Sequence, residues 1–183
     1  MVVNQVRQSG ILLHPTALPG PNGIGDIGYP AYRFIDQLSD MGQGLWQILP
    51  IGPTDVHNSP YSSISTFAGN HLLISLDLLV EEGLLDSKYL EGFKEVDSHK
   101  ILFDHVIRFK RPILKQVCRS FNMNSSAEMK ISFKKFCMDQ SFWLDNYSHY
   151  WALKEENNQQ SWIDWNSITA QNTEYVHEAK EIQ

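Results

Sequence analysis

Cysteine is scarce in this sequence, because Cys118 and Cys137 are the two cysteines among 183 residues. They form no Cys-x-x-Cys pair and stand in no metal-ligand grouping, which argues against a disulfide framework and against a bound metal. Both lie in segments with helical spacing of apolar residues, and we expect two inert buried thiols. Unpaired thiols are typical of a reducing compartment, so the sequence predicts a cytoplasmic protein.

The sequence also lacks clustered positive charge and long apolar runs. Its 15 Lys and Arg residues are scattered and are outnumbered by 21 Asp and Glu, for a net charge of −6. Binding a phosphate backbone needs clustered positive charge, so nucleic acid is not an expected partner. No stretch reaches membrane-spanning length and the N-terminus has no apolar core of a secretory signal, so no membrane association is expected either. The composition, 42% hydrophobic and 20% charged, is that of an ordinary globular chain.

Three consecutive segments near the start predict a strand, a helix and a second strand. Residues 10–16 are a short apolar run interrupted by Pro15, which is typical of a buried strand. Residues 30–41 keep helical spacing of apolar side chains and are followed by Gly42, a common helix stop. Residues 45–51 are too short for a typical helix and end at proline and glycine, which favours a strand buried on both faces. This order predicts two parallel strands, the start of an α/β sheet or barrel.

The rest of the chain is dominated by helical patterns. Residues 72–80 fit a strand, a helix or one after the other, because periodicity does not decide for so short a run. Residues 101–121 have helical spacing, with Pro112 expected to kink or divide the helix. A further helix is predicted from about residue 125 to 154, and a polar one from about 172. The expected buried stripe of the 125–154 helix consists of Phe133, Phe136, Cys137, Trp143, Leu144, Tyr147 and Trp151.

These elements do not complete an α/β domain. One crossover and two or three strands leave sheet edges that must be paired or covered. We therefore expect either further chain after Gln183 or a partner that supplies the missing strands.

The acidic and histidine residues of the loops form no catalytic set in the sequence. Residues 23–28 match the dinucleotide fingerprint Gly-x-Gly-x-x-Gly, but they neither follow a strand directly nor open a helix, which favours glycines that form turns. His14 and His57 lie at predicted strand ends, where a metal pair or a general base is one interpretation. Neither has a Ser-His-Asp or His-x-x-x-His companion, which favours structural roles. Asp26 and Asp55 are interpreted as turn-forming loop acids.

The loop after the second predicted strand carries the strongest indication of a ligand site. It contains Ser59, Pro60 and Tyr61, and the proline stiffens the backbone so that the Tyr61 ring is held in place. An aromatic ring beside hydroxyls and amides suits a pyranose sugar, whose faces are apolar and whose rim forms hydrogen bonds. A packed turn without a ligand is the alternative that the residues alone leave open.

Five short motifs resemble, in the same order, the N-terminal region of 4-α-glucanotransferases, the amylomaltase or disproportionating-enzyme family. They are residues 11–21 (Ile-Leu-Leu-His-Pro-Thr-Ala-Leu-Pro-Gly-Pro), 23–25 (Gly-Ile-Gly), 46–54 (Trp-Gln-Ile-Leu-Pro-Ile-Gly-Pro-Thr), 59–62 (Ser-Pro-Tyr-Ser) and 67–70 (Phe-Ala-Gly-Asn). Residues 143–147, 152–154 and 161–165 resemble the helical insert of the same family. The resemblance therefore covers nearly the whole chain.

The resemblance implies an α/β fold, an incomplete (β/α)8 TIM barrel in which residues 1–85 supply the first two strands and residues 86–183 a helical insert truncated at its C-terminus. It implies a glycosyltransferase of carbohydrate metabolism that acts on α-1,4-glucans and maltooligosaccharides by a retaining double displacement, with no metal or organic cofactor. The family's catalytic carboxylates lie on later strands, so none is assigned to this chain. The substrate-binding residues that it implies are Tyr61, beside the sugar at the cleavage point, and Ser59.

The chain departs from the family pattern at two positions. His71 replaces the proline usual after Gly-Asn, and Val56 stands where some members have an aromatic residue for an accessory glucan contact, so no accessory site is assigned. We expect this chain to be inactive alone. The alternative is a non-catalytic piece that binds glucan or assembles with a complementary chain, which would supply the rest of the barrel.

Overall fold

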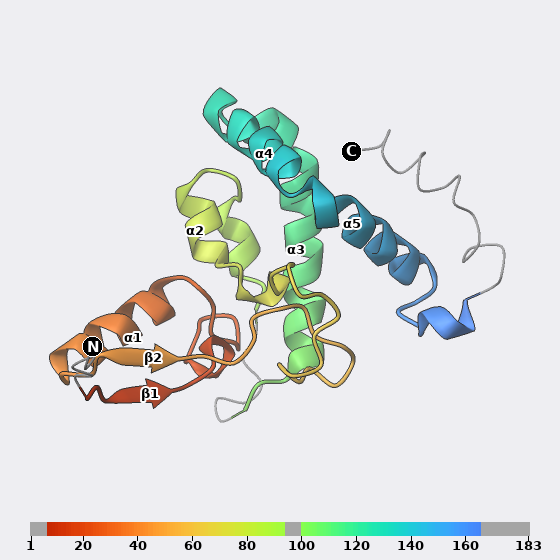
Figure 1. Cartoon of the computed structure of the whole chain (residues 1–183). Coiled ribbons are helices and arrows are strands. Elements are labelled where there is room, and N and C mark those ends of the chain that lie inside the picture. The colour runs from red at the N-terminus through yellow and green to blue at the C-terminus, as the bar shows by residue number, and fades with distance from the viewer. Residues whose placement is uncertain (1–6, 94–99, 166–183) are drawn as a thin grey trace, which may run out of the picture. The chain divides into compact units, whose positions relative to one another are not determined.

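The computed structural model describes residues 7–93 and 100–165 (Figure 1). The chain divides into two compact units, Met1–Ser126 and Ala127–Gln183. The sequence predicts a boundary at residue 85 between a barrel and an insert. The division into compact units at residue 126 does not test that prediction. The polar helix predicted from about residue 172 lies outside the described residues.

A parallel pair of strands begins the first unit, as predicted. Strand β1 (Gly10–Leu12) pairs with β2 (Leu45–Gln47), and Ile11 lies opposite Trp46. Helix α1 (Tyr29–Asp40) connects them, with a proline in its first turn, and Gly42 just beyond it adopts a φ of 67°. A positive φ is the conformation that favours glycine after a helix, so local sequence signals set both ends of α1.

Both strands are shorter and more exposed than the sequence predicts. The first ends before the 3-10 helix η1 (Pro15–Ala17), and the second ends before Pro50, which has no N–H for a strand ladder. A parallel sheet is buried when helices cover both of its faces. Among the described residues, α1 packs on β2, where the ring of Phe34 meets that of Trp46 edge-on at 5.0 Å. The prediction of burial on both faces is therefore wrong for this chain, since Leu45 and Leu12 are exposed.

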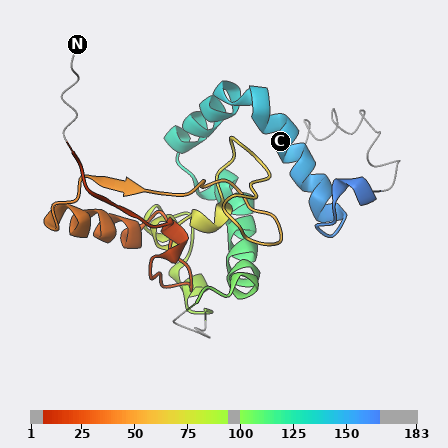
Figure 2. The ribbon, with the colours of Figure 1, turned by 60° about the horizontal axis from the view of Figure 1, so that its bottom comes forward.

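The core of the first unit lies where the segment after β2 meets a long helix. The ambiguous stretch 72–80 is helical, with the 3-10 helix η2 (His71–Leu73) followed by α2 (Leu76–Glu81). After η3 (Ser87–Leu90), helix α3 (Phe103–Asn124) runs through Pro112 without being divided. Figure 2 shows η2 beside α3, and there Ile24, Leu72 and Val106 form a buried apolar cluster.

Over residues 127–156, where the sequence predicts one helix, the second unit has two α-helices. Helices α4 (Ala127–Asp139) and α5 (Ser141–Glu156) are separated at Gln140, and a short 3-10 helix η4 (Trp162–Asp164) follows. The predicted buried stripe is wrong, because neither helix has a buried residue and Phe133 is 54% exposed. An apolar stripe is buried only where another layer covers it, and here the rings of α5 contact one another along the helix instead.

The two cysteines also differ from expectation. Both lie in helices and are free thiols, but Cys118 is exposed and Cys137 is partly exposed, so neither is a buried core residue. Among the described residues, no helix combines the length and the apolar character needed to cross a bilayer.

Candidate functional site

The loop that follows β2 is fastened at its neck, which spans residues 53–54 and 63–64. Thr54 and Ser63 form an antiparallel bridge. The carbonyl of Pro53 accepts two hydrogen bonds from the returning segment, one from the Ser63 hydroxyl at 3.2 Å and one from the Ile64 amide at 3.0 Å. A loop closed in this way loses little additional entropy when it binds a ligand.

The tip of the same loop is a series of tight turns. The Asp55 carboxylate accepts the His57 amide at 2.9 Å, which confirms the predicted turn-forming role of Asp55. Asn58 adopts a φ of 56°, a left-handed conformation that asparagine tolerates. The Tyr61 amide donates to the Ser59 hydroxyl oxygen at 3.4 Å, and Tyr61 is 76% exposed. The backbone is thus fixed, while the phenol ring is presented to solvent.

His14 joins the end of the first strand segment to the start of this loop. Its Nε2 lies 3.2 Å from the Pro50 carbonyl oxygen, and its Nδ1 lies 2.8 Å from the Thr16 hydroxyl and 3.3 Å from the Thr16 amide. A carbonyl only accepts, so Nε2 carries the proton and Nδ1 accepts. These bonds use both ring nitrogens and support the predicted structural role. Within residues 7–93 and 100–165, no three His, Cys, Asp or Glu side chains are grouped to hold a metal ion.

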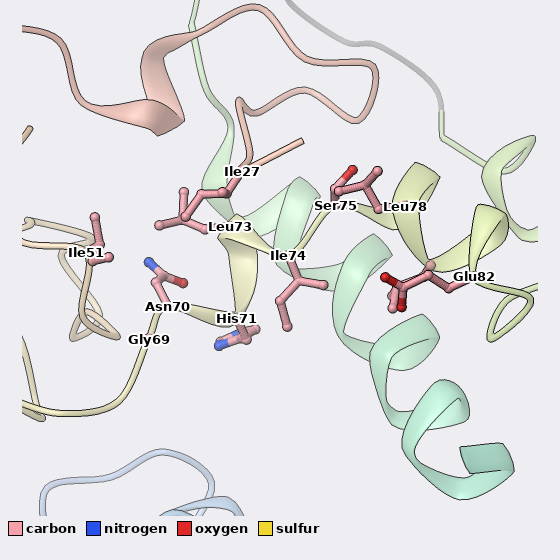
Figure 3. A pocket seen from close by; sticks show the side chains of 11 residues that line it. Ile27, Ile51, Gly69, Asn70, His71, Leu73, Ile74, Ser75, Leu78 and Glu82 are labelled. Carbon is pink, nitrogen blue, oxygen red and sulfur yellow. The ribbon is translucent and has the colours of Figure 1, made fainter. Parts of the chain in front are cut away.

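A pocket of about 460 Å³ adjoins the base of the loop (Figure 3). Its wall is mainly apolar and includes Ile27, Ile51, Leu73, Ile74 and Leu78. Asn70 and His71 contribute polar groups on the side nearest Ile51, and Glu82 contributes one on the opposite side. An apolar wall with a few polar groups is typical of small-ligand pockets.

Asn70 connects this pocket to the loop. Its amide donates to the Ile51 carbonyl at 2.8 Å, and its side-chain oxygen accepts the Leu72 amide at 2.9 Å, which caps η2. The residue is buried, so both bonds are shielded from water. Sequence reasoning used Asn70 only as part of a family motif and missed this role, although Asn before a helical segment is a recognised capping signal.

The glycine-rich segment 23–28 is a structural turn, as predicted, and Gly23 adopts a φ of 70°. Asp26 within it, however, is more than a turn-forming acid, because its carboxylate is buried and lies 3.9 Å from the ammonium of Lys110 on α3. The Lys110 Nζ also donates to the carbonyl oxygens of Leu72 and Ile74, each at 2.7 Å. The segment therefore holds a buried ion pair and, in this structure, packs against α3.

Burial shifts both members of this pair towards their neutral forms. It raises the pKa of Asp26 from its usual range and lowers the pKa of Lys110 to about 8, although the carboxylates of Asp26 and Asp77 act in the opposite direction on the lysine. Between pH 8 and the ordinary lysine value of 10.5, the unfolded chain holds a proton that the folded chain has released. The contribution of Lys110 to stability is therefore smallest below pH 8 and rises as the pH passes through that window.

The Lys110 pKa can be measured directly. We expect the Cε resonance of Lys110 to titrate near pH 8 in a carbon-detected NMR experiment. Lys88 is the control, because its ammonium donates a hydrogen bond to the adjacent Asp86 carboxylate in an exposed ion pair, which raises its pKa. A Lys110 midpoint equal to or above that of Lys88 would contradict the buried placement.

Sequence reasoning missed Lys110, although a signal was present. Residues 106, 110, 113 and 117 follow helical spacing on α3, and the other three are buried aliphatic side chains. A lysine at a core position of such a stripe is unusual, because charged side chains are almost never fully buried unless they are paired. Tyr61 and Ser59, by contrast, lie together on the fastened loop, as expected of neighbours in sequence.

Comparison with known proteins identifies a family that the chain matches over most of its length. The model of a protein family described as 4-alpha-glucanotransferase matches residues 13–183. A 4-alpha-glucanotransferase of Synechocystis sp. is 44% identical over 164 residues, covering 90% of this chain and 32% of the relative. One of Streptococcus pneumoniae is 43% identical over 166 residues, covering 87% of this chain and 31% of the relative.

A solved structure of an amylomaltase also matches this chain. The amylomaltase from Streptococcus agalactiae in complex with acarbose matches with a TM-score of 0.87 and 29% identity, covering 97% of this chain and 36% of that one. The chain thus spans about a third of the length of the proteins that it matches. Its fold is a mixed α/β arrangement that corresponds to part of an amylomaltase.

Proposed function

Because this chain belongs to the 4-alpha-glucanotransferase family, glycoside hydrolase family 77, we propose that it is the N-terminal, sugar-positioning portion of an enzyme that transfers α-1,4-glucan segments between maltooligosaccharides. The observation that carries the proposal is the fastened loop at residues 53–64, which lies within the matched region and presents the Tyr61 ring to solvent. The acarbose bound to the Streptococcus agalactiae relative, an α-glucan mimic, supports the substrate class.

The proposed architecture is a (β/α)8 barrel to which this chain contributes the first two strands. Strands β1 and β2 are parallel and joined by α1, which is the repeating unit of such a barrel. Residues 1–85 would begin the barrel, and residues 86–183, whose described part is helical, would be an insert before the third strand. The rest of the barrel is the proposed partner of the exposed sheet faces.

In the proposed reaction, Tyr61 and Ser59 hold the sugar while carboxylates elsewhere in the enzyme transfer it. One carboxylate attacks the anomeric carbon and forms a glycosyl-enzyme, as a carboxylic acid protonates the departing sugar oxygen. The resulting base then removes a proton from the hydroxyl of an acceptor sugar, which attacks the same carbon and restores the original configuration. These steps need no metal or organic cofactor.

The side chains of the loop are suited to holding a sugar. The exposed Tyr61 ring offers an apolar face to a pyranose. The Ser59 oxygen already accepts the Tyr61 amide, so its O–H remains available to donate to a sugar hydroxyl. The free thiols of Cys118 and Cys137 suit the proposed cytoplasmic location of the reaction.

A complementation experiment tests the proposal. The purified 183-residue chain should not disproportionate maltotriose, because it carries none of the proposed catalytic carboxylates. Mixed with the remaining two thirds of the Synechocystis relative, it should restore the release of glucose and longer maltooligosaccharides. Disproportionation by the chain alone would overturn the assignment of catalysis to the missing part.

The exposed strands favour a second candidate function, a non-catalytic piece that binds glucan or assembles with a complementary chain. Titration of maltoheptaose onto the chain, combined with the complementation assay, separates the two candidates. Binding without any activity in the complemented mixture would favour the second function, whereas restored activity favours the first.

Replacing Tyr61 with alanine should lower kcat/KM for maltotriose in the complemented mixture by about tenfold, since the loss of a stacked ring costs about 1.4 kcal/mol of binding. Val56→Ala is the matched control, because Val56 is an apolar residue of the same loop and is 72% exposed. The control should stay within about twofold of the unmodified chain. Equal losses in both variants would argue against a specific role for the ring.

A further inference from the structure

Lys110 occupies a position on α3 where an apolar side chain would be expected. Its neighbours on the same helical face, Val106, Ile113 and Val117, are buried aliphatic residues, and Lys110 itself is 0% exposed. Taking an ammonium group out of water is costly unless its protons are well bonded. A charged side chain at this position therefore indicates a role in hydrogen bonding that an apolar side chain could not fill.

The ammonium bonds to backbone carbonyls that lie far from it in sequence. Leu72 is the middle residue of η2, and Ile74 is the C-cap residue just after it. Both carbonyl oxygens lie 2.7 Å from the Lys110 Nζ. Carbonyls at the end of a helical turn carry partial negative charge and need a donor when they are buried. Lys110 supplies both donors from another element.

A relay of hydrogen bonds continues from these carbonyls to the base of the loop. The amide of Leu72 donates to the Asn70 side chain at 2.9 Å, and the amide of Asn70 donates to the Ile51 carbonyl at 2.8 Å. Ile51 stands at the start of the segment that carries the loop neck, and the amide of Ile27 bonds to the Leu73 carbonyl at 2.9 Å from the other side. The backbone around residues 70–74 is thus held by bonds to three separate parts of the first unit.

We propose that Lys110 is a positioning residue, which fixes the backbone of residues 70–74 and through Asn70 the base of the loop that presents Ser59 and Tyr61. Its role in substrate binding rests on the proposed function, whereas its role in holding the backbone does not. Asp26 faces the ammonium at 3.9 Å and orients it from the glycine-rich segment. Without the ammonium, the buried Leu72 carbonyl and the partly buried Ile74 carbonyl lose their donor, and the segment shifts to find another.

Amide hydrogen exchange on the 183-residue chain tests the proposal without any need for activity. In Lys110→Met, which keeps an unbranched chain of similar length, the amides of Asn70 and Leu72 should exchange about tenfold faster than in the unmodified chain. The amide of Met41, which bonds to Gln37 at the end of α1, should be unchanged. Equal acceleration at all three amides, or none at Asn70 and Leu72, would overturn the proposal.

Two further variants separate positioning from general stabilisation. Lys110→Arg retains the charge and the donors and should restore part of the protection at Asn70 and Leu72. Lys115→Met on an exposed position of the same helix should leave both amides unchanged. If Lys110→Met does not fold, amide hydrogen exchange of the unmodified chain in dilute guanidinium tests whether α3 holds the backbone of residues 70–74. Opening of Asn70 and Leu72 together with Val106 of α3 supports the proposal, and opening independent of α3 contradicts it.

A kinetic measurement connects the backbone role to the substrate. In the complemented mixture, Lys110→Met should raise KM for maltotriose severalfold while the two polypeptides still copurify. An unchanged KM together with faster local exchange would show that Lys110 holds the backbone but has no role in substrate binding. Failure of the unmodified chain to restore activity would count against the proposed function and leave the exchange result standing.

Discussion

Replacing Ile24 with alanine should lower the free energy of unfolding by about 3 kcal/mol, within the range of about 2 to 5 kcal/mol found for buried large-to-small substitutions. Ile24 is 2% exposed and packs with Leu72 and Val106, so the substitution removes apolar contacts at the meeting point of the glycine-rich segment, η2 and α3. The surrounding backbone is fixed by hydrogen bonds and cannot close the cavity easily. Urea denaturation followed by tryptophan fluorescence measures the difference.

Ile27 provides a matched control in the same segment. It has the same side chain but is 48% exposed, so Ile27→Ala should cost less than about 1 kcal/mol. The contrast between the two variants depends on burial alone, because residue type and local segment are shared. Similar costs at the two positions would show that Ile24 is not packed in the core as the structure places it.

The sequence was most informative where structure is decided locally. Helix α1 and its parallel neighbours follow from hydrophobic spacing, from the proline in the first turn and from Gly42 after the last one. The extent and burial of the strands were not predictable in the same way, because both depend on what pairs with and covers them. The run at 72–80 was undecided for the same reason, and it is resolved as helix in the structure, where Leu76 is buried and Asn70 caps η2.

The residues of the candidate site differ in the same way, between those set by local sequence and those set by distant contacts. Ser59 and Tyr61 were predicted because they are neighbours in one stiff loop, and their ligand role remains a proposal. Lys110 was not predicted, because the carbonyls that it bonds lie 36 and 38 residues away in the chain. Asp26 was interpreted from its own loop alone, whereas its burial depends on α3. A residue whose role is defined by distant partners is found from a structure. The other signal is a charged residue on an otherwise apolar helical stripe.

The largest effect in the glycine-rich segment is expected from Gly25→Ala, which should lower the free energy of unfolding by about 3 kcal/mol or more. A Cβ at Gly25 would lie 2.1 Å from the Pro15 carbonyl oxygen and 2.7 Å from that of Leu18. Both are backbone atoms, which cannot rotate away as the end of a flexible side chain can. The Gly25 amide also donates to the Thr16 carbonyl at 3.0 Å, so the segment cannot move without breaking that bond.

Gly69→Ala is the control for this prediction, because a Cβ at Gly69 meets nothing within 4 Å. It should change the free energy of unfolding by less than about 0.5 kcal/mol, in the range typical of surface substitutions. The two variants add the same methyl group, so a difference between them reports the close approach of the Pro15 and Leu18 backbone to the glycine-rich segment. If Gly25→Ala were as stable as Gly69→Ala, that segment would not pack against residues 15–18, and the glycines of the 23–25 motif would need another explanation.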